Sequence, residues 1–521
     1  MTRRRWVLTA LAVLAVAAIG IGYYELEISE QDIYVPLFAA HCGDCHGNDL
    51  RGTDRGPSLL DGELAGGDAV AALVRSIGHG APDAGMPAFS GVLSGEEIKG
   101  LAIYVGERRL GLRFSDFRYD ADVRIPTDPV HSEVHDFYIE TFAEGLDPMP
   151  FGLAALPDGS FLLTEKERGL SVISPDGVQS APIEGTPETG GSVDFRGIQL
   201  GLGWLLDAVP HPDYEDNGWI YLHYTELCGE RCDRPDEWNL LPKSMNRLDR
   251  GRIVDGRWVD VENIWHAEPE HYAFSPDTGA GGRIAFDGEG HVFISVGIAL
   301  DGLEPQLLEA PFGKIHRVND DGTIPSDNPL LITGRIPADA PFHVQSIWTY
   351  GHRSPQGLQW NPRRGAVWEA EMGPRGGDEI NELRPGGNYG WPFHSLGLEY
   401  SGVTVARHEA EGIEFDLDDV EMPLTHFTPS PAISSFAFYS GDAFPGWQND
   451  VLLGSLKGSS LFRLVFDSDR LVHEETLIKD LARIRDVEIG NDGLVYLLLE
   501  NEAGSRVVRL VPAADRTAAR P

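Results

Sequence analysis

The chain has 521 residues, with 42 Lys or Arg against 81 Asp or Glu, so its formal net charge at pH 7 is −39. This acidity argues against nucleic acid and anionic membrane surfaces as partners, and it suits solubility or a basic protein partner. The length exceeds one ordinary core, and 61 Gly with 35 Pro indicate many turns, so we expect two domains after an N-terminal segment.

Residues 1–29 form that segment. Three arginines, Arg3 to Arg5, precede an uncharged run from Trp6 to Gly22, which is typical of a signal peptide or of a membrane anchor with its positive end in the cytoplasm. No small-residue cleavage site stands just before Glu25, which favours an uncleaved anchor. Either interpretation predicts a periplasmic or other extracytoplasmic protein, attached to the inner membrane at most through this segment.

The next feature is the heptapeptide His41-Cys42-Gly43-Asp44-Cys45-His46-Gly47. Cys42 and Cys45 lie on one face of a helical turn, where both thiols can form thioethers to a haem while His46 reaches the iron. A zinc half-site or a redox dithiol is the alternative, but a zinc site needs further ligands nearby. The motif therefore predicts covalently attached haem c.

Met86, in Gly85-Met86-Pro87, is the candidate for the second axial ligand because no other Met lies in this region. Packing in the core is the ordinary role of a Met. A His/Met pair raises the haem potential, which suits an electron acceptor.

Two helices are predicted around that loop. Asp68 is expected to cap a helix whose apolar stripe runs from Val70 to Ile77, and Ser94 with Glu97 forms a capping box before a second helix. With the haem motif, residues 30–112 resemble a class I cytochrome c domain. The stretch Gly56-Pro57-Ser58-Leu59 matches that family, in which the Pro carbonyl orients the proximal His.

After a linker, predicted over residues 113–135, the pattern changes to short strands that follow turn residues. Six such units are expected to hold strands at Phe161 to Thr164, Trp219 to Tyr224, His291 to Val296, Ala366 to Ala370, Val451 to Leu456 and Leu494 to Leu499. Their spacing of roughly 64 residues suits four-stranded blades. We expect a mainly β fold, a six-bladed β-propeller over residues 136–514, and a disordered tail at 515–521. The composition alone leaves a β-sandwich array or two smaller barrels open.

The remaining cysteines, Cys228 and Cys232, lie close together in a loop. An oxidising compartment would favour a local disulfide between them, and two free thiols are the alternative.

Three motifs in the propeller region carry a family resemblance. They are Tyr350-Gly351-His352-Arg353-Ser354-Pro355-Gln356-Gly357-Leu358, Gly373-Pro374-Arg375-Gly376-Gly377-Asp378-Glu379-Ile380-Asn381 and Gly387-Asn388-Tyr389-Gly390-Trp391-Pro392. With Leu456-Lys457-Gly458 and Arg483-Ile484-Arg485-Asp486, they follow the order of the soluble glucose/sorbosone dehydrogenase family, which residues 140 to 512 resemble. The resemblance implies a six-bladed propeller that uses pyrroloquinoline quinone (PQQ).

The resemblance also implies a set of site residues. Arg353, Lys457, Arg483 and Arg485 would hold the carboxylates and oxygens of PQQ. The main-chain carbonyls of Gly373 and Pro374 would bind a Ca²⁺ beside it, and a second, structural Ca²⁺ would lie near Glu379 and Tyr389. Fixed cations and a Lewis acid are what a tricarboxylic quinone requires. Ordinary surface or inter-blade ion pairs are the alternative for these cations.

The chain departs from the family around the reacting carbon. The family's general base, a His, corresponds to Gly279, and three further polar positions correspond to Leu202, Ile298 and Ser354. His271, in the loop eight residues upstream of Gly279, is the candidate replacement base.

Two functions follow from this pattern. The first is an exported dehydrogenase in which a sugar-like alcohol gives electrons to PQQ, then to the tethered haem, and then to a downstream acceptor such as another cytochrome. The second is a propeller that binds a carbohydrate or a partner beside an electron-transfer cytochrome.

Overall fold

The computed structural model describes residues 32–64, 66–112, 120, 122–195, 198–229, 243–273, 277–298, 302–405, 413 and 415–513. The predicted segment Trp6 to Gly22 and the tail at 515–521 lie outside these residues. Within the described ranges, no helix combines the length and apolar character that crossing a bilayer requires.

A small helical domain comes first and contains α2 (Tyr34–His41), α3 (Gly43–His46), α4 (Val70–His79), η1 (Pro82–Ala84) and α5 (Gly95–Leu110). Its core joins the inner faces of these helices, and Phe38, Leu73 and Leu101 are buried in it. The capping box is confirmed, because Ser94 Oγ accepts from Glu97 N while Ser94 N donates to the Glu97 carboxylate. This pairing satisfies main-chain groups that the first turn of α5 would otherwise leave unpaired.

The predicted cap at Asp68 is wrong. Helix α4 has Ala69 as its N-cap, without a side-chain cap hydrogen bond. The Asp68 carboxylate instead accepts from Arg109 Nη2 at 2.7 Å and from Leu64 N at 3.2 Å. Asp68 therefore forms an ion pair with Arg109 of α5 instead of the α4 cap that its local sequence pattern predicts.

The rest of the chain forms six antiparallel sheets arranged as blades, plus a hairpin of β5 (Ser192–Phe195) and β6 (Ile198–Gly201). The first three blades contain β2 (Pro150–Ala155), β3 (Phe161–Glu165) and β4 (Gly169–Ile173); β7 (Leu205–Pro210), β8 (Ile220–Leu227), β9 (Ser244–Val254) and β10 (Arg257–Trp265); β11 (Gly281–Phe286), β12 (His291–Val296), β13 (Lys314–Asn319) and β14 (Ile347–Tyr350). The last three contain β15 (Pro355–Asn361), β16 (Ala366–Glu371), β17 (Asp378–Glu382) and β18 (Thr425–Phe427); β19 (Ile433–Phe438), β20 (Val451–Ser455), β21 (Leu461–Asp467) and β22 (Arg470–Ile478); β23 (Arg483–Ile489), β24 (Val495–Glu500), β25 (Ser505–Pro512) and β1 (Phe137–Leu146).

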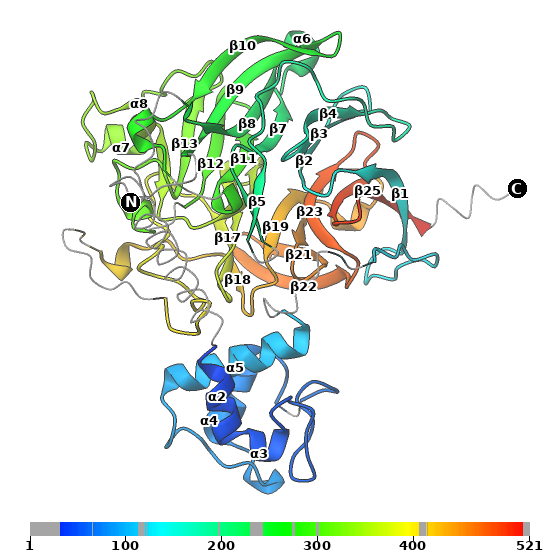
Figure 1. The fold of residues 1–521 in the computed structure, drawn as a ribbon, viewed down its shortest axis with the longest axis vertical. Helices are drawn as coiled ribbons and strands as arrows, with labels where there is room; N and C mark the ends of the chain where they lie inside the picture. The colour runs from blue at the N-terminus through cyan, green and yellow to red at the C-terminus, as the bar shows by residue number, and fades with distance from the viewer. Residues whose placement is uncertain are drawn as a thin grey trace, which may run out of the picture.

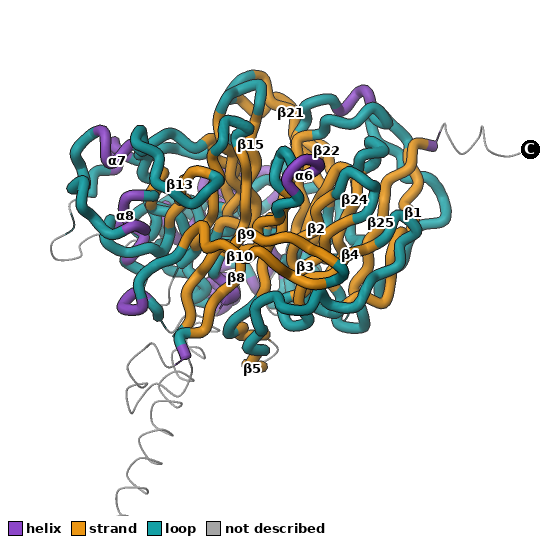
Figure 2. Tube along the Cα trace, turned by 90° about the horizontal axis from the view of Figure 1, so that it is seen from above, coloured by secondary structure: helices purple, strands orange, loops and turns teal. Residues whose placement is uncertain are grey.

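The blades close into a ring, as the sequence predicts. The innermost strands β2, β7, β11, β15, β19 and β23 contact one another in that order, and β23 returns to β2. The last blade is completed by the first strand, since β1 pairs with β25 in the register Phe137↔Pro512. This closure excludes the sandwich array and the pair of barrels. Short helices α6 (Tyr214–Asn217), α7 (Pro329–Ile332) and α8 (Phe342–Gln345) lie at the periphery of the propeller (Figure 1), and Figure 2 shows the same propeller from above.

The six strands predicted from sequence occupy the same place in their blades. They correspond to β3, β8, β12, β16, β20 and β24, the second strand of each blade. Each follows the turn that reverses the chain after an innermost strand, and Asp-Gly and similar turn residues make that reversal recognisable. The repeated pattern is therefore the inner hairpin of every blade.

One predicted cross-link involves residues beyond the described ranges. Cys228 is buried and disulfide-bonded. Its predicted partner, Cys232, lies outside the described residues.

The helical domain is docked on the propeller through a buried ion-pair cluster. Arg375, in the loop between β16 and β17, donates from Nη2 to Glu107 of α5 at 2.6 Å and to Asp32 at 3.1 Å. Leu398 of the propeller joins the core of the helical domain. Figure 1 shows α5 on the side that faces the propeller and α3 on the far side.

Candidate active site

A cavity of about 230 Å³ opens at one end of the propeller, and all six blades contribute to its walls. Most lining segments either lead into an innermost strand, as Trp204, Asp277, Arg353 and Ser430 do, or follow a second strand, as Lys166, Met372 and Lys457 do, while Tyr400 comes from the segment between β17 and β18. These two kinds of segment lie at the same end of a blade, opposite the turns that reveal the repeat in the sequence.

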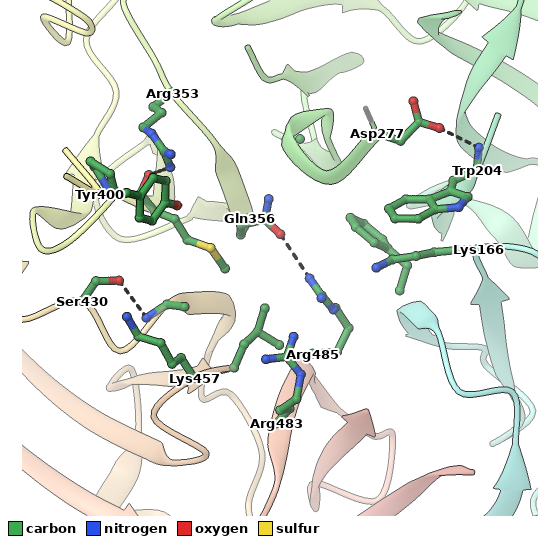
Figure 3. A pocket seen from close by; sticks show the side chains of 17 residues that line it. Lys166, Trp204, Asp277, Arg353, Gln356, Tyr400, Ser430, Lys457, Arg483 and Arg485 are labelled. Atoms are coloured by element: carbon green, nitrogen blue, oxygen red, sulfur yellow. Dashed lines mark hydrogen bonds between the residues drawn. The ribbon is translucent and has the colours of Figure 1, made fainter. Parts of the chain in front are cut away.

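The four predicted quinone-binding cations meet in this cavity. Arg353, Lys457, Arg483 and Arg485 all line it, and Lys166 adds a fifth positive side chain (Figure 3). The four cations come from three different blades. Their meeting there rules out an outward-facing set of surface ion pairs.

Glu500 of β24 anchors one wall of the cavity. Its carboxylate accepts from Arg483 Nε at 2.9 Å and from Arg485 Nη2 at 3.0 Å, and it lies 3.7 Å from Lys166 Nζ. Burial alone would raise the pKa of Glu500, but Arg485, Arg483 and Lys166 hold it at about 2. One permanent negative charge is therefore shared among three cations, and positive charge remains in excess.

Two of the guanidinium groups have hydrogen-bonding capacity left over. Arg353 Nη1 donates to Met372 O at 2.9 Å, and Arg485 Nη1 donates to Gln356 Oε1 at 3.2 Å. The Nε atoms of Arg353 and Arg485 are buried without a hydrogen-bond partner in the described part of the chain. Buried donors of this kind, beside unbalanced positive charge, fit a polyanionic ligand such as PQQ.

Gly373 and Pro374 also line the cavity, in the loop after β16. Asp378 fixes this loop, because its carboxylate accepts from Gly373 N at 2.9 Å and from Ile433 N at 3.0 Å. A side chain at Gly373 would collide with Gly376 O, so the tight loop requires glycine there. A main-chain loop fixed at the cavity wall fits the predicted Ca²⁺ beside the quinone.

A separate acidic cluster lies behind this wall. His352 Nδ1 is 3.4 Å from Glu369 and 3.7 Å from Glu371, and Glu379 is buried beside them. Burial and then Glu371 raise the pKa of Glu379 well above its usual value. The oxygens Glu369 Oε1 and Asn381 Oδ1 are buried without a partner among the described residues. Unpaired oxygens and surplus carboxylates fit the predicted second Ca²⁺.

Tyr389, the other residue predicted near that ion, is packed against the same cluster. Its ring stacks on His352 with the centroids 4.6 Å apart. Its hydroxyl donates to Glu382 O at 2.9 Å and accepts from Arg384 N at 2.9 Å. Because the hydroxyl is already engaged with main chain, Tyr389 contributes to this site through its ring and its backbone.

One contact expected for the haem motif is present. His46 Nδ1 lies 2.9 Å from Pro57 O, as the cytochrome resemblance implies, which would leave Nε2 available to a haem iron. Cys42, the N-cap residue of α3, and Cys45, within α3, are free thiols. Burial and then Cys45 raise the pKa of Cys42 to about 11. Met86 lies in a two-residue bridge with Ala81 that closes the loop after α4.

His271 is not among the cavity-lining residues. It ends η4 (Pro269–His271), and its ring lies 4.4 Å from that of His343 in α8. None of the four family positions with altered polarity, Gly279, Leu202, Ile298 and Ser354, lines the cavity either. The structure therefore gives His271 no place beside a ligand of the cavity.

Several cavity residues were missed at the level of sequence. They are Phe151, Lys166, Trp204, Asp277, Gln356, Tyr400 and Ser430. The sequence held a signal for two of them. Lys166 belongs to a charged pair that directly follows a predicted apolar strand, and Asp277 lies two residues before Gly279.

Asp277 is held rigidly in the wall. Its carboxylate accepts from Trp204 N at 3.0 Å, from Thr225 Oγ1 at 2.5 Å and from Ser244 Oγ at 3.3 Å. Burial raises the pKa of Asp277 to about 6, although these donors oppose the rise. Both oxygens are therefore engaged in tying together the strands that form this wall.

Comparison with known proteins agrees with this geometry. Residues 147–509 match the family described as Glucose / Sorbosone dehydrogenase, and residues 34–105 match Cytochrome C oxidase, cbb3-type, subunit III. The chain is 33% identical to an aldose sugar dehydrogenase of Escherichia coli over 370 residues, which cover 70% of this chain and 91% of that protein. It is 26% identical to quinoprotein glucose dehydrogenase B of Acinetobacter calcoaceticus, over 68% of this chain and 84% of that one.

A solved structure of a relative shares the propeller. The soluble aldose sugar dehydrogenase of Escherichia coli, in its apo form, aligns with a TM-score of 0.60 and 32% identity, covering 72% of this chain and 99% of its own. Taken with the family match over most of the chain, these observations lead to one conclusion: the protein belongs to the glucose/sorbosone dehydrogenase family and carries a cytochrome c domain ahead of its propeller.

Proposed function

We propose that this protein is an extracytoplasmic quinoprotein dehydrogenase, which oxidises an aldose or a similar alcohol and passes the electrons to its own c-type haem. The observation that carries the proposal is the cavity lined by five basic side chains, two of which hold buried Nε donors without a partner in the described part of the chain. The Escherichia coli relative is an aldose sugar dehydrogenase, and the Acinetobacter relative is a quinoprotein. The disulfide-bonded Cys228 supports an oxidising compartment.

In this proposal, Arg353, Lys457, Arg483 and Arg485 bind the carboxylates of PQQ, and the Gly373–Pro374 loop binds Ca²⁺ beside it. The chemistry that this cofactor supplies when bound is hydride acceptance at an ortho-quinone. The cavity walls provide the rest: fixed charge that orients the ligand, and apolar surface that excludes water.

The docking of the cytochrome domain supports electron transfer within one chain. Arg375, which binds Glu107 and Asp32 of that domain, directly follows Gly373 and Pro374 of the cavity wall. Its Nη1 also donates to the main-chain oxygen of Tyr400, another cavity residue, at 3.4 Å. Fixed docking gives the haem a high effective concentration as acceptor. The haem motif in α3 lies on the side away from the propeller, where a further acceptor has access (Figure 1).

The test is reconstitution of the purified protein with PQQ and Ca²⁺, followed by addition of aldoses. We expect the visible spectrum of the haem to change to that of the ferrous form, and no change when PQQ is omitted. A haem that stays oxidised with every aldose and polyol, yet is reduced by a chemical reductant, would contradict the proposal.

One observation favours a second candidate. No histidine is among the described residues that line the cavity, so the usual proton acceptor of such enzymes is missing. A propeller that binds a carbohydrate without oxidising it would show saturable sugar binding in calorimetry and no haem reduction in the same assay.

A further inference from the structure

We propose that the amine of Lys166 is the catalytic base of this protein and accepts the hydroxyl proton of the alcohol substrate. The inference rests on the dehydrogenase function proposed above. It assigns a residue that neither the motifs nor the relatives indicated.

The first support is the position of Lys166. It directly follows β3, is only 6% exposed, and lines the cavity. Figure 3 shows its side chain extending from the wall toward the centre of the cavity, beside Trp204. The nitrogen lies 4.4 Å from the centroid of the Trp204 ring and 5.9 Å from that of Phe151. An aromatic wall therefore holds the amine where a ligand would meet it.

The second support is the charge around it. Glu500 on β24 is the carboxylate facing Lys166, at 3.7 Å, and it is also bound by Arg483 and Arg485 of β23. Guanidinium groups keep their protons at any pH that a protein tolerates, so the lysine is the member of this cluster that can lose one. Burial and then Arg485 lower the pKa of Lys166 to about 7, although Glu500 opposes the shift. Near neutral pH a large fraction of this side chain is a neutral amine.

The other titratable cavity residues suit the role less well. Asp277 has both oxygens engaged by Trp204, Thr225 and Ser244. Burial also lowers the pKa of Lys457, although Glu107 and Asp378 oppose the shift, and the proposed function already assigns this side chain to the carboxylates of PQQ. Lys166 combines burial, a lowered pKa and an orientation into the cavity.

The third support is a link to the segment where the family resemblance places a base. Trp204, whose ring covers Lys166, donates its main-chain N–H to Asp277, the first residue of η5 (Asp277–Gly279). Asp277 lines the cavity, whereas Gly279, the position of the family's base, ends this same turn outside the cavity lining. Lys166 is therefore connected through Trp204 to the turn that carries glycine in place of the expected base.

The step balances as follows. The O–H bond of the substrate breaks while an N–H bond forms on Lys166 Nζ. The carbon that bears this hydroxyl group loses its hydrogen together with two electrons, which pass to the ortho-quinone cofactor. The alcohol thereby becomes a carbonyl compound. The protonated lysine then returns its proton to water.

The experiment compares Lys166→Arg and Lys166→Met with the parent and with Lys479→Met, a control at an exposed lysine. We expect both Lys166 variants to lose roughly 100- to 10,000-fold in kcat. Lys166→Arg should keep the parent's affinity for PQQ, measured by spectroscopic titration, because it keeps the charge. In the parent and in the control, kcat should fall as the pH is lowered through about 7, because Lys166 gains a proton there. Both Lys166 variants should lack this fall in kcat.

A readout without turnover completes the test. Reductive methylation with ¹³C-formaldehyde, followed by NMR titration of the PQQ-free protein, should reveal one lysine with a midpoint near pH 7 that is missing in Lys166→Arg. A midpoint near 10, or a Lys166→Arg variant with parental kcat, would overturn the assignment while leaving the dehydrogenase intact. A parent that oxidises no aldose would overturn the proposed function and this assignment together.

Discussion

The two redox sites that we propose for this protein are built in opposite ways. The haem site is local: Cys42, Cys45 and His46 lie within five residues, and Pro57, eleven residues on, orients the His. The cavity is distributed, since its cations come from segments more than 300 residues apart, from Lys166 to Arg485. A covalent site needs little support beyond one helical turn, whereas a non-covalent site for a polyanion needs charges fixed on several rigid strands.

The largest effect is expected where the distributed site loses one cation. Lys457→Ala removes one positive charge from the cavity wall, so we expect PQQ affinity to fall about 100-fold, as for truncation of one partner in a buried charged pair. Titration of the purified protein with PQQ measures this affinity. Lys479→Ala, at an exposed position, is the matched control. Equal PQQ affinity in both variants would mean that Lys457 only supports the fold.

The local site should lose its second axial ligand in Met86→Ala. Because a Met ligand raises the haem potential, we expect a fall of roughly a tenth of a volt, within the ~0.8 V range that axial ligands span. Redox titration and the low-spin spectrum report the change. PQQ binding should stay at the parental level, since the two sites share no residue. An unchanged spectrum would assign the ligand to another side chain.

The connection between the sites is tested by Glu107→Gln. This change weakens a buried ion pair in which the Arg375 guanidinium binds both carboxylate oxygens, at 2.6 Å and 3.2 Å. We expect haem reduction by substrate to slow about tenfold, which corresponds to roughly 1.4 kcal/mol of lost docking free energy. Turnover with a small soluble dye should stay unchanged.

The control is Glu96→Gln, at an exposed position of the same helix. If stopped-flow traces of haem reduction coincide for Glu107→Gln and the parent, electrons reach the haem without this docking.

The smallest effect concerns how the stability of the propeller depends on pH. Burial raises the pKa of Glu488, which accepts from Ala155 N at 3.2 Å between the first and last blades, to about 8. The folded protein thus holds a proton that the unfolded chain releases near pH 4.5, so this residue's contribution to stability is lost as pH rises from about 4.5 to 8. We expect Glu488→Gln to flatten that decline by a few degrees in Tm at most.

Thermal unfolding at pH 5 and pH 8 provides the measurement for this prediction. Glu289→Gln, an exposed change in another blade, is the control. A decline that is equally steep in Glu488→Gln and the parent would assign the pH dependence to other groups.

The same contrast explains what the sequence could predict. Local chemistry was readable: the haem motif, the Ser94 capping box and the turns before each second strand all lie within a few residues of one another. Four cavity cations were found through family motifs, and they meet as expected. Lys166 and Trp204 carry no motif, because their proximity arises only when the first two blades pack against each other.

The errors have physical causes of the same kind. Asp68 resembles a helix cap in sequence, but Arg109 of another helix binds its carboxylate. His271 is close to Gly279 along the chain, yet its short helical turn packs against α8 on the periphery. In both positions a contact with a distant segment overrides the expectation from chain proximity.

The pairing of β1 with β25 also imposes an order of assembly. Translation delivers the haem motif and β1 long before Ser505–Pro512, the strand that β1 must meet. The cytochrome domain can therefore fold and acquire its porphyrin while β1 still waits for a neighbour. A chain that ends before β25 would therefore hold a folded cytochrome domain joined to a propeller whose last blade lacks β25 and leaves β1 unpaired.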